Sequence, residues 1–367
     1  MIKVVVIGTR GFPDVQGGVE KHCQQIYPLL AQMGVNVTIL TRRPYINEAL
    51  KSYKGVSLVA IDCPKQKYLE AIVHSFKALI YAIKLKPDII HVHAVGPALI
   101  TPFARLLGFK VVFTHHGPDY ERKKWNKIAK LILKIGDAFG CLFANKIITI
   151  AQNIAESISR KFKKTATIIP NGVVITNVLS PGEAIKGFGL QPQKYILTVG
   201  RFVPEKGFND LILAYRKSGT DGIKLVIVGG ADHEDEYSRK IKDSVKGDPN
   251  IILTGFLTGT TLEELYSNAG FFVLPSYYEG LPITLLEAMS YGLRCLASDI
   301  PANRCVRLND NNYFRAGDIA NLSAKIKQLI DNPLSDKESK EQVDKLRRDY
   351  DWNIIAQKTL KIYEELI

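Results

Sequence analysis

The sequence predicts two α/β domains, each built on a doubly wound parallel sheet. Its 367 residues, of which 46% are hydrophobic, exceed what one ordinary core needs. Short β-branched runs alternate with amphipathic stretches, the pattern of a parallel sheet covered by helices. The alternation stops in a Gly- and Pro-rich segment at about 170–193 and then resumes, which indicates a domain boundary.

The strands of the first domain are expected at 2–7, 36–40, 57–61, 89–92, 110–114 and 146–150. Those of the second are expected at 195–199, 224–228, 251–254, 271–274 and 294–297. We therefore place the first domain at 1–178 and the second at 179–350, with a C-terminal helix, 351–367, packing back toward the first domain. Ligands of such sheets bind at the carboxyl ends of the strands.

The amino-acid composition indicates the cell compartment of the protein and the kind of partner that it binds. The five cysteines form no CxxC pair, which disfavours a disulfide framework and favours a reducing cytoplasm. No signal peptide or uninterrupted apolar span is visible, so membrane association is expected to be peripheral. Residues 1–178 hold 25 Lys and Arg against 10 Asp and Glu, a net charge of +15, whereas residues 179–367 carry −2. An anionic partner, a lipid surface or a nucleic acid, is therefore expected at the first domain.

The most specific motif is Glu279-Gly-Leu-Pro-Ile-Thr-Leu-Leu-Glu287, which follows an expected strand. Pro282 suits the first turn of a helix, so Glu279 lies in the loop ahead and Glu287 more than a turn inside. The amides of Gly280 and Leu281 can point at a phosphate or hydroxyl, because a helix N-terminus favours negative charge. Glu279 can then accept sugar hydroxyls, and Glu287 can reach a ribose. The alternative is a solvated loop glutamate and an unrelated glutamate on a helix face.

A second motif, Arg201-Phe-Val-Pro-Glu205-Lys206, lies between an expected strand and a helix expected at 208–218. Arg201 offers a planar guanidinium with paired N–H donors, and Lys206 offers a compact ammonium charge. Together they suit a diphosphate leaving group, which gains negative charge as its bond breaks. The alternative is a basic loop with an exposed ion pair to Glu205. Both motifs follow strands of one sheet, which favours a shared ligand site.

Paired glycines, Gly17 and Gly18, lie between a strand and a helix in the first domain. Glycines let a ligand approach the backbone closely. The segment matches neither GxGxxG nor the P-loop lysine motif, which disfavours a dinucleotide site or a nucleoside triphosphatase.

With Thr114-His-His116-Gly117 and Pro170-Asn-Gly-Val173, these motifs make the chain resemble glycosyltransferase family 4, the retaining GT-B enzymes, over essentially its whole length. The resemblance implies two Rossmann-like domains facing across a cleft, the first for the acceptor and the second for the nucleotide-sugar donor. It implies transfer of a hexose, N-acetylhexosamine or deoxyhexose, with UDP favoured as the nucleotide. The expected acceptor is a polyprenyl-diphosphate-linked saccharide of bacterial polysaccharide or lipopolysaccharide biosynthesis.

The resemblance also implies roles for the second-domain residues. Arg201 and Lys206 would hold the donor diphosphate, Glu279 the transferred sugar and Glu287 the ribose. Retaining chemistry of this family implies front-face attack, in which the donor's own phosphate oxygen helps to deprotonate the acceptor hydroxyl. No protein nucleophile is then required.

In the first domain, the resemblance implies that Gly17 and Gly18 close over the phosphates and that His116 lies near the sugar and acceptor. His93 would be structural support. One position departs from the family pattern: relatives usually carry a glutamate before the valine, and this chain has Cys305 there.

No metal and no cofactor besides the nucleotide-sugar co-substrate is expected. The DxD sequence, Asp349-Tyr-Asp351, directly precedes the last helix, where aspartate is a good N-cap. Two other functions remain as alternatives. A nucleotide-sugar epimerase of the same two-domain shape would share diphosphate binding, and a non-catalytic basic protein would bind nucleic acid through the first domain. The second lacks an evident recognition motif, so no nucleic acid is expected.

A helix beginning near Arg122 and covering 122–135 is expected to dock on an anionic membrane at its cytoplasmic face. Four lysines at i, i+4, i+7 and i+11 form one stripe: Lys123, Lys127, Lys130 and Lys134. Four apolar residues are expected on the opposite side: Trp125, Ile128, Ile132 and Ile135. The alternative is an ordinary surface helix whose apolar side packs on its own sheet.

Overall fold

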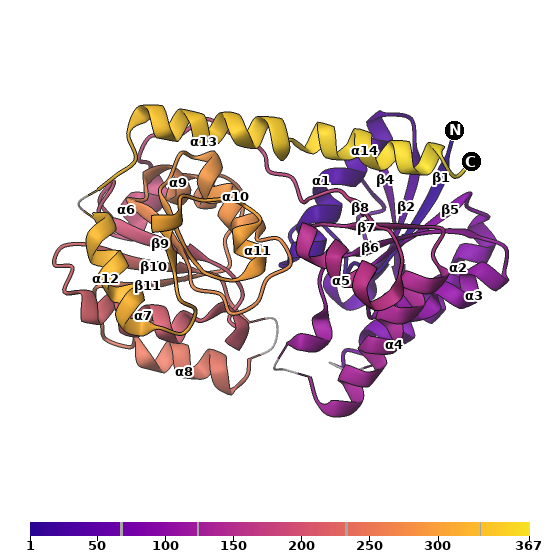
Figure 1. The fold of residues 1–367 in the computed structure, drawn as a ribbon, viewed down its shortest axis with the longest axis horizontal. Helices are drawn as coiled ribbons and strands as arrows, with labels where there is room; N and C mark the ends of the chain where they lie inside the picture. Colours follow the sequence, from indigo (N-terminus) through magenta and orange to yellow (C-terminus); the bar gives the residue numbers. More distant parts are fainter. Residues whose placement is uncertain (67–68, 123–124, 232–233, 331) are drawn as a thin grey trace. The chain divides into compact units, whose positions relative to one another are not determined.

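The computed structural model describes residues 1–66, 69–122, 125–231, 234–330 and 332–367. The chain divides into two compact units, which are described separately. The first unit comprises residues 1–172 and 352–367, and the second comprises residues 173–351. Each unit has a central sheet flanked by helices (Figure 1).

The sheet of the first unit has the order β3-β4-β2-β1-β5-β6-β7-β8. Neighbouring strands run parallel except β3 and β4. Its strands are β1 (Lys3–Ile7), β2 (Asn36–Arg42), β3 (Ser52–Tyr53), β4 (Val56–Ile61), β5 (Ile89–His93), β6 (Lys110–His115), β7 (Lys146–Thr149) and β8 (Thr167–Ile168). Because β1 lies between β2 and β5, the strand order reverses there. A ligand crevice is therefore expected at the carboxyl ends of β1 and β5.

The helices of the first unit are α1 (Gly18–Gln32), α2 (Glu70–Leu85), α3 (Thr101–Leu106), α4 (Lys127–Phe143), α5 (Gln152–Phe162) and α14 (Trp352–Glu364). Short 3-10 turns join them: η1 (Arg43–Tyr45), η2 (Pro97–Ile100) and η3 (Asp119–Glu121). Helix α1 repeats apolar residues at Cys23, Ile26, Tyr27 and Leu30, and these bury one face against the sheet. Helix α14 shares this core and so belongs to the first unit although it ends the chain.

Helix α4 begins at Lys127 and not near Arg122, so the predicted start was wrong. The Asn126 side chain caps the helix by accepting a hydrogen bond at 2.8 Å from an amide of the first turn. Trp125 precedes the helix, and Lys123 lies outside the described residues. The lysine stripe on the described part of the helix therefore has three members.

The sheet of the second unit has the order β11-β10-β9-β12-β13-β14, and all neighbours run parallel. Its strands are β9 (Tyr195–Val199), β10 (Lys224–Val228), β11 (Ile251–Gly255), β12 (Phe271–Leu274), β13 (Cys295–Ser298) and β14 (Tyr313–Phe314). Here the order reverses between β9 and β12. The loops that leave the carboxyl ends of these two strands are therefore neighbours.

The helices of the second unit are α6 (Glu183–Gly187), α7 (Phe208–Ser218), α8 (Glu236–Ser244), α9 (Gly259–Asn268), α10 (Ile283–Ser290), α11 (Pro301–Arg304), α12 (Ile319–Ile330) and α13 (Asp336–Asp349). Two 3-10 turns, η4 (Pro204–Lys206) and η5 (Asp310–Asn312), complete the unit. Helix α7 buries Phe208, Leu211, Ile212 and Tyr215, spaced at i, i+3, i+4 and i+7, in the same core as residues of α12.

Across the described ranges, we find no helix with the length and apolar composition needed to cross a bilayer.

Candidate active site

Lys206 and Glu279 meet at the strand reversal of the second unit. The Lys206 Nζ donates to Glu279 Oε1 at 2.6 Å, and the Ser276 hydroxyl donates to the same oxygen at 2.6 Å. The two charged side chains are 17% and 12% exposed, so their attraction is only partly screened by water. The predicted cation loop after β9 and the predicted glutamate loop after β12 thus form one charged cluster.

A close backbone contact locks the two loops together. Gly207 adopts a φ of +65°, and a Cβ at this position would lie 2.2 Å from the carbonyl oxygen of Pro275. The Tyr277 amide donates to the Glu205 carbonyl at 2.8 Å. Glycine is therefore required where the η4 turn packs on the loop that follows β12.

The exposed ion pair between the basic loop and Glu205, the alternative weighed from sequence, is wrong. Glu205 is buried at 7% exposure, and its two carboxylate oxygens have no hydrogen-bond partner among the described residues. Lys206 pairs with Glu279 instead. Arg201 lies partly exposed in the same loop, directly after Gly200 at the end of β9.

Helix α10 carries the rest of the glutamate motif. Pro282 directly precedes its first residue, and Gly280 and Leu281 form the loop immediately before it. Glu287 lies more than one turn inside, where its Oε2 accepts a hydrogen bond from the Tyr266 hydroxyl at 3.2 Å. Burial, and then the Glu287 charge, raise the pKa of Tyr266, so this hydroxyl stays a donor and orients the carboxylate.

The glycine pair begins α1 in the first unit. A Cβ on Gly17 would lie 2.0 Å from Glu20 Oε2, whereas one on Gly18 would meet nothing within 4 Å. Glu20 accepts hydrogen bonds from the Arg10 amide at 3.1 Å and the Arg10 Nε at 3.2 Å. Burial opposes ionisation of Glu20, but the Arg10 guanidinium lowers its pKa below the ordinary value. This buried ion pair holds the loop before α1 and leaves the Gly18 side open to a ligand.

His22, His93 and His116 form a cluster at the carboxyl end of β5. The ring centroid of His116 lies 5.0 Å from that of His22 and 5.2 Å from that of His93. His93 Nδ1 and His116 Nε2 are 2.9 Å apart. Burial lowers the pKa of His22 to about 4 and lowers those of His93 and His116 well below the ordinary value. The three rings are therefore neutral imidazoles at physiological pH.

The adjacent histidine, His115, is structural. Its Nδ1 accepts the Gly117 amide at 3.0 Å, so its Nε2 carries the proton that it donates to Asp137 Oδ1 at 3.0 Å. The Tyr120 hydroxyl donates to the other Asp137 oxygen at 2.9 Å. These bonds fix the turn after β6 and so fix the position of His116.

Family models match both halves of the chain. "Glycosyltransferase Family 4" matches residues 16–177, and "Glycosyl transferases group 1" matches residues 183–348. The chain belongs to glycosyltransferase family 4.

This glycosyltransferase is similar to bacterial glycosyltransferases. It is 26% identical to UDP-Gal:alpha-D-GlcNAc-diphosphoundecaprenol alpha-1,3-galactosyltransferase of Escherichia coli, over 81% of this chain and 80% of that protein. It is 24% identical to the amylovoran biosynthesis glycosyltransferase AmsD of Erwinia amylovora, over 86% of both chains. These relatives support a glycosyltransferase that acts in polysaccharide biosynthesis.

A solved structure gives the same fold for the glycosyltransferase. Sucrose-phosphate synthase from Thermosynechococcus elongatus matches with a TM-score of 0.84 at 20% identity, over 100% of this chain and 99% of that one. The GT-B fold predicted from the sequence, with two parallel-sheet α/β domains, is confirmed.

The contacts of three residues in the glycosyltransferase's first unit, His22, Asn171 and Trp352, were not predicted from the sequence. The His22 Nδ1 bonds to Asn171 Oδ1 at 3.0 Å, so the Pro170-Asn-Gly-Val motif holds the histidine cluster. The Trp352 ring packs on His22, with centroids 5.5 Å apart. The available signals were His22, one turn after the glycine pair, and the Pro170-Asn-Gly-Val173 motif, to which no contact had been assigned.

The position that departs from the family, Cys305, is the residue after α11. Its carbonyl accepts a hydrogen bond from the Tyr350 hydroxyl at 3.4 Å. Asp349 ends α13 and Asp351 directly precedes α14, so the DxD sequence lies at a helix junction. Among the described residues, the group with metal-ligating spacing is His22, His93 and His116, whose ligand atoms lie within 4.8 Å of one another.

Proposed function

We propose that the chain is a retaining glycosyltransferase that transfers a hexose, N-acetylhexosamine or deoxyhexose from a UDP-sugar to a polyprenyl-diphosphate-linked saccharide. The observation that carries the proposal is the 2.6 Å contact between Lys206 and Glu279 at the strand reversal of the second unit. The Escherichia coli relative, whose name specifies UDP-galactose and a diphosphoundecaprenol-linked acceptor, supports the choice of donor and acceptor.

The second unit supplies charges that match a leaving diphosphate. As the glycosidic bond to phosphate breaks, negative charge grows on the diphosphate, and Lys206 and Arg201 stabilise that charge. Glu279 holds Lys206 in place and accepts hydrogen bonds from hydroxyls of the transferred sugar. The α10 N-terminus, with the amides of Gly280 and Leu281 before it, favours the same negative charge.

Glu287 of the second unit, and Gly18 and His116 of the first unit, are each assigned a further role. The Tyr266 hydroxyl orients the Glu287 carboxylate, which is proposed to accept hydrogen bonds from the ribose hydroxyls. Gly18 presents an open backbone to the donor phosphates, and the buried Arg10–Glu20 pair stiffens the loop around it. His116, held by the turn that His115 stabilises, contacts the sugar and the acceptor hydroxyl.

The donor and the stereochemistry are tested together. A thermal-shift screen of UDP-, GDP-, ADP- and dTDP-sugars is expected to raise the melting temperature with UDP-sugars, because a ligand that binds only the folded state stabilises it. The product's anomeric configuration, measured by NMR, is expected to equal that of the donor. Transfer is expected to continue in EDTA, because the two cations replace a catalytic metal.

An inverted anomer would contradict the retaining mechanism. Loss of transfer in EDTA that magnesium restores would contradict the assignment of the diphosphate to Lys206 and Arg201. Glu279→Ala is expected to abolish transfer while the fold remains intact. Wild-type turnover in that variant would remove Glu279 from the site.

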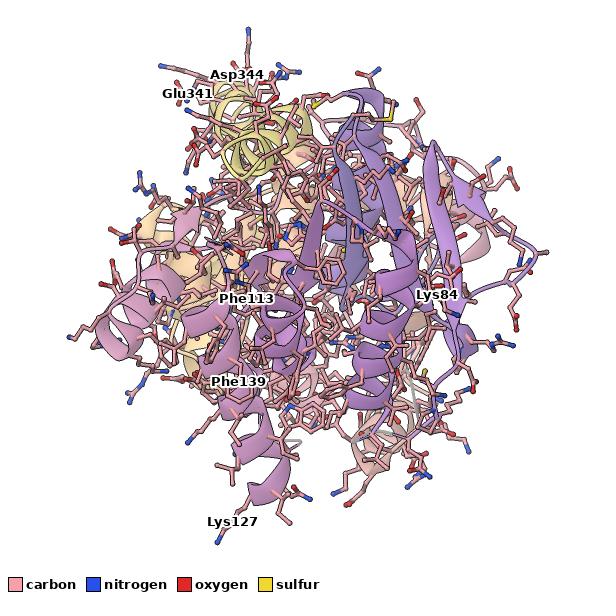
Figure 2. The ribbon with its side chains drawn as sticks, turned by 90° about the vertical axis from the view of Figure 1, so that its right-hand side faces the viewer. Lys84, Phe113, Lys127, Phe139, Glu341 and Asp344 are labelled. Carbon is pink, nitrogen blue, oxygen red and sulfur yellow. The ribbon has the colours of Figure 1, made fainter. Side chains whose placement is uncertain are left out.

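We propose in addition that α4 and its neighbours dock on the anionic inner face of the cell membrane. Ile128, Leu131 and Ile135 are 71%, 60% and 38% exposed, so this side of α4 does not pack on its own sheet as an ordinary surface helix would. At 3.6 residues per turn, Leu131 lies beside the lysines, and Ile135 and Ile128 lie farther round the helix from them. Figure 2 shows Lys127 at the outer end of α4, projecting away from its sheet.

The neighbouring helices extend this apolar surface. Helix α3, which packs against α4, exposes Leu106 and Phe103 at 85% and 45%. The Phe103 ring contacts Phe76 of α2 with centroids 5.5 Å apart, and α2 exposes Ile80 at 63%. A contiguous apolar surface with basic residues at its edge is typical of a membrane-binding face.

Vesicle binding tests the docking surface. The described lysines, Lys127, Lys130 and Lys134, contribute about 3 kcal/mol together at about 1 kcal/mol each, which supports reversible binding. Replacing all three with glutamine, or Leu131 with serine, is expected to release the protein from phosphatidylglycerol vesicles. Transfer to a soluble acceptor is expected to stay normal.

The matched control for Leu131→Ser is Leu213→Ser on α7, because Leu213 is 51% exposed in the second unit. This control is expected to bind vesicles like the wild type. Equal binding by the Leu131 and lysine variants, or no binding of the wild type at low salt, would show that this surface is not the docking site.

A further inference from the structure

We propose that His22, His93 and His116 form a binding site for one divalent transition-metal ion of the zinc class. The three imidazoles come from separate elements: His22 from α1, His93 from the last position of β5, and His116 from the residue after β6. Their ligand atoms lie within 4.8 Å of one another. Three histidines with a fourth position left to water or another ligand are a known zinc arrangement.

The hydrogen bonds decide which nitrogen of each ring is available. Asn171 Oδ1 can only accept, so the His22 Nδ1 3.0 Å away carries its proton and leaves the Nε2 lone pair free. His93 Nε2 is hydrogen-bonded to the Tyr27 hydroxyl, which leaves Nδ1 directed at His116. The metal ligands would therefore be His22 Nε2, His93 Nδ1 and His116 Nε2.

The spacing of one pair of rings, His93 and His116, is close to that of two ligands of one ion. Ligand nitrogens about 2.0–2.1 Å from a tetrahedral zinc lie about 3.3 Å from one another. His93 Nδ1 and His116 Nε2 are 2.9 Å apart, a distance at which one nitrogen carries a proton that the other accepts. A metal ion would replace this shared proton, and the two rings would separate by a few tenths of an ångström.

The outer contacts match those of metal-ligating histidines. Such histidines usually bond their second ring nitrogen to a carbonyl, carboxylate or other polar group, which fixes the ring and its tautomer. Asn171 serves His22 in this way, and the buried Tyr27 serves His93. His22 and His93 are buried, whereas His116 is partly exposed, so an ion can enter on the His116 side.

Cobalt is the probe, because Co²⁺ replaces zinc in such sites and absorbs visible light when held in a tetrahedral field. Protein stripped with a chelator is expected to bind one Co²⁺ with a visible absorption band that Zn²⁺ abolishes by competition. His22→Gln is expected to lose the band. Tyr27→Phe and Asn171→Ala, which leave all three ligands in place, are expected to weaken affinity about 10–100-fold.

The matched control is His74→Gln, because His74 is a buried histidine of the same unit that lies on α2 outside the cluster. It is expected to bind Co²⁺ like the wild type, and circular dichroism checks that each variant is folded. Absence of a cobalt band in the folded wild type would overturn the site. Unchanged affinity in Tyr27→Phe and Asn171→Ala would overturn the assigned ligand atoms.

One consequence for activity rests on the proposed function. An ion on His116 Nε2 removes the nitrogen proposed to contact sugar and acceptor, so Zn²⁺ is expected to slow transfer and a chelator to restore it. Transfer without added metal is expected to be at its maximum. Bound cobalt without any slowing would contradict the role of His116 in transfer, whereas a missing cobalt band contradicts the metal site itself.

Discussion

Removal of the Lys206 ammonium tests whether the charged cluster of the second unit acts in transfer. In Lys206→Ala, the rate of transfer is expected to fall by about 10²–10³, or about 2.7–4 kcal/mol, as when one preorganised donor to a developing charge is removed. Donor affinity is expected to fall less, because the diphosphate gains its extra charge only as the bond breaks. Single-turnover transfer and donor titration measure the two effects.

The structure indicates how much of the loss could come from the fold. At 2.6 Å and an effective dielectric constant of about 20, the attraction between Lys206 and Glu279 has a gross value of about 6 kcal/mol. Desolvation of the two partly buried groups offsets most of this attraction. We expect the variant to lose about 1–3 kcal/mol of unfolding free energy, less than the 5–15 kcal/mol that typical domains have. The variant should therefore remain folded.

A second variant separates the two effects. In Lys206→Ala/Glu279→Gln the unpaired carboxylate is gone, so the unfolding free energy is expected to recover while transfer stays low. The control Arg216→Ala breaks an exposed ion pair of the same unit, Arg216–Asp248 at 2.9 Å, and is expected to transfer at nearly the wild-type rate. Transfer within threefold of the wild type in Lys206→Ala would refute the assigned role, as would recovery of transfer in the double variant.

Two further predictions concern the scaffold. Gly207→Ala is expected to lower the unfolding free energy of the second unit by roughly 1–3 kcal/mol more than Gly219→Ala, measured by urea titration. Both glycines have a positive φ, +65° and +61°, but of the two only Gly207 faces a backbone atom, the Pro275 oxygen. Equal losses of unfolding free energy in the two variants would refute the close contact. Burial raises the pKa of Asp137, but the hydrogen bonds from His115 and Tyr120 outweigh it and hold the pKa below 3.8. The ionised Asp137 therefore stabilises the fold above its ordinary pKa of 3.8, and this contribution is lost as pH falls through the lower folded-state pKa. In Asp137→Asn, the unfolding free energy of the first unit should consequently depend less on pH below about pH 4.

The sequence predicted the long strands because β-branched residues concentrate where both faces of a strand are buried. Strands β9 and β12 have the predicted bounds, and α7 has the predicted helix bounds. The two-residue strands β3, β8 and β14 are too short to show any periodicity. The start of α4 was missed for a different reason, since the lysine spacing was followed and Asn126, a good N-cap residue, was overlooked.

From the sequence, the two loops of the second unit were predicted to follow strands of one sheet and to lie at the same edge of it. It could not show that they touch, because contact depends on β12 pairing directly with β9, although β10 and β11 intervene in the chain. Likewise, no local pattern could have shown that Lys206 prefers Glu279 to its sequence neighbour Glu205. That preference arises because the glycine at 207 lets η4 approach Pro275, which buries Glu205 and turns Lys206 toward the next loop.

The histidine cluster shows the limit of reasoning from motifs. His22 occupies an amphipathic helix, His93 a buried strand and His116 a turn, and each has an ordinary explanation there. Their convergence depends on β5 and β6 being neighbours and on α1 lying at their carboxyl ends. This is a tertiary arrangement that the 93 residues between His22 and His116 do not encode locally. Asn171 and Tyr27 then select the protonated nitrogens of two rings. The same neutral imidazoles can therefore accept a sugar hydroxyl or a metal ion, and competition between these two ligands for His116 is what the zinc and cobalt measurements resolve.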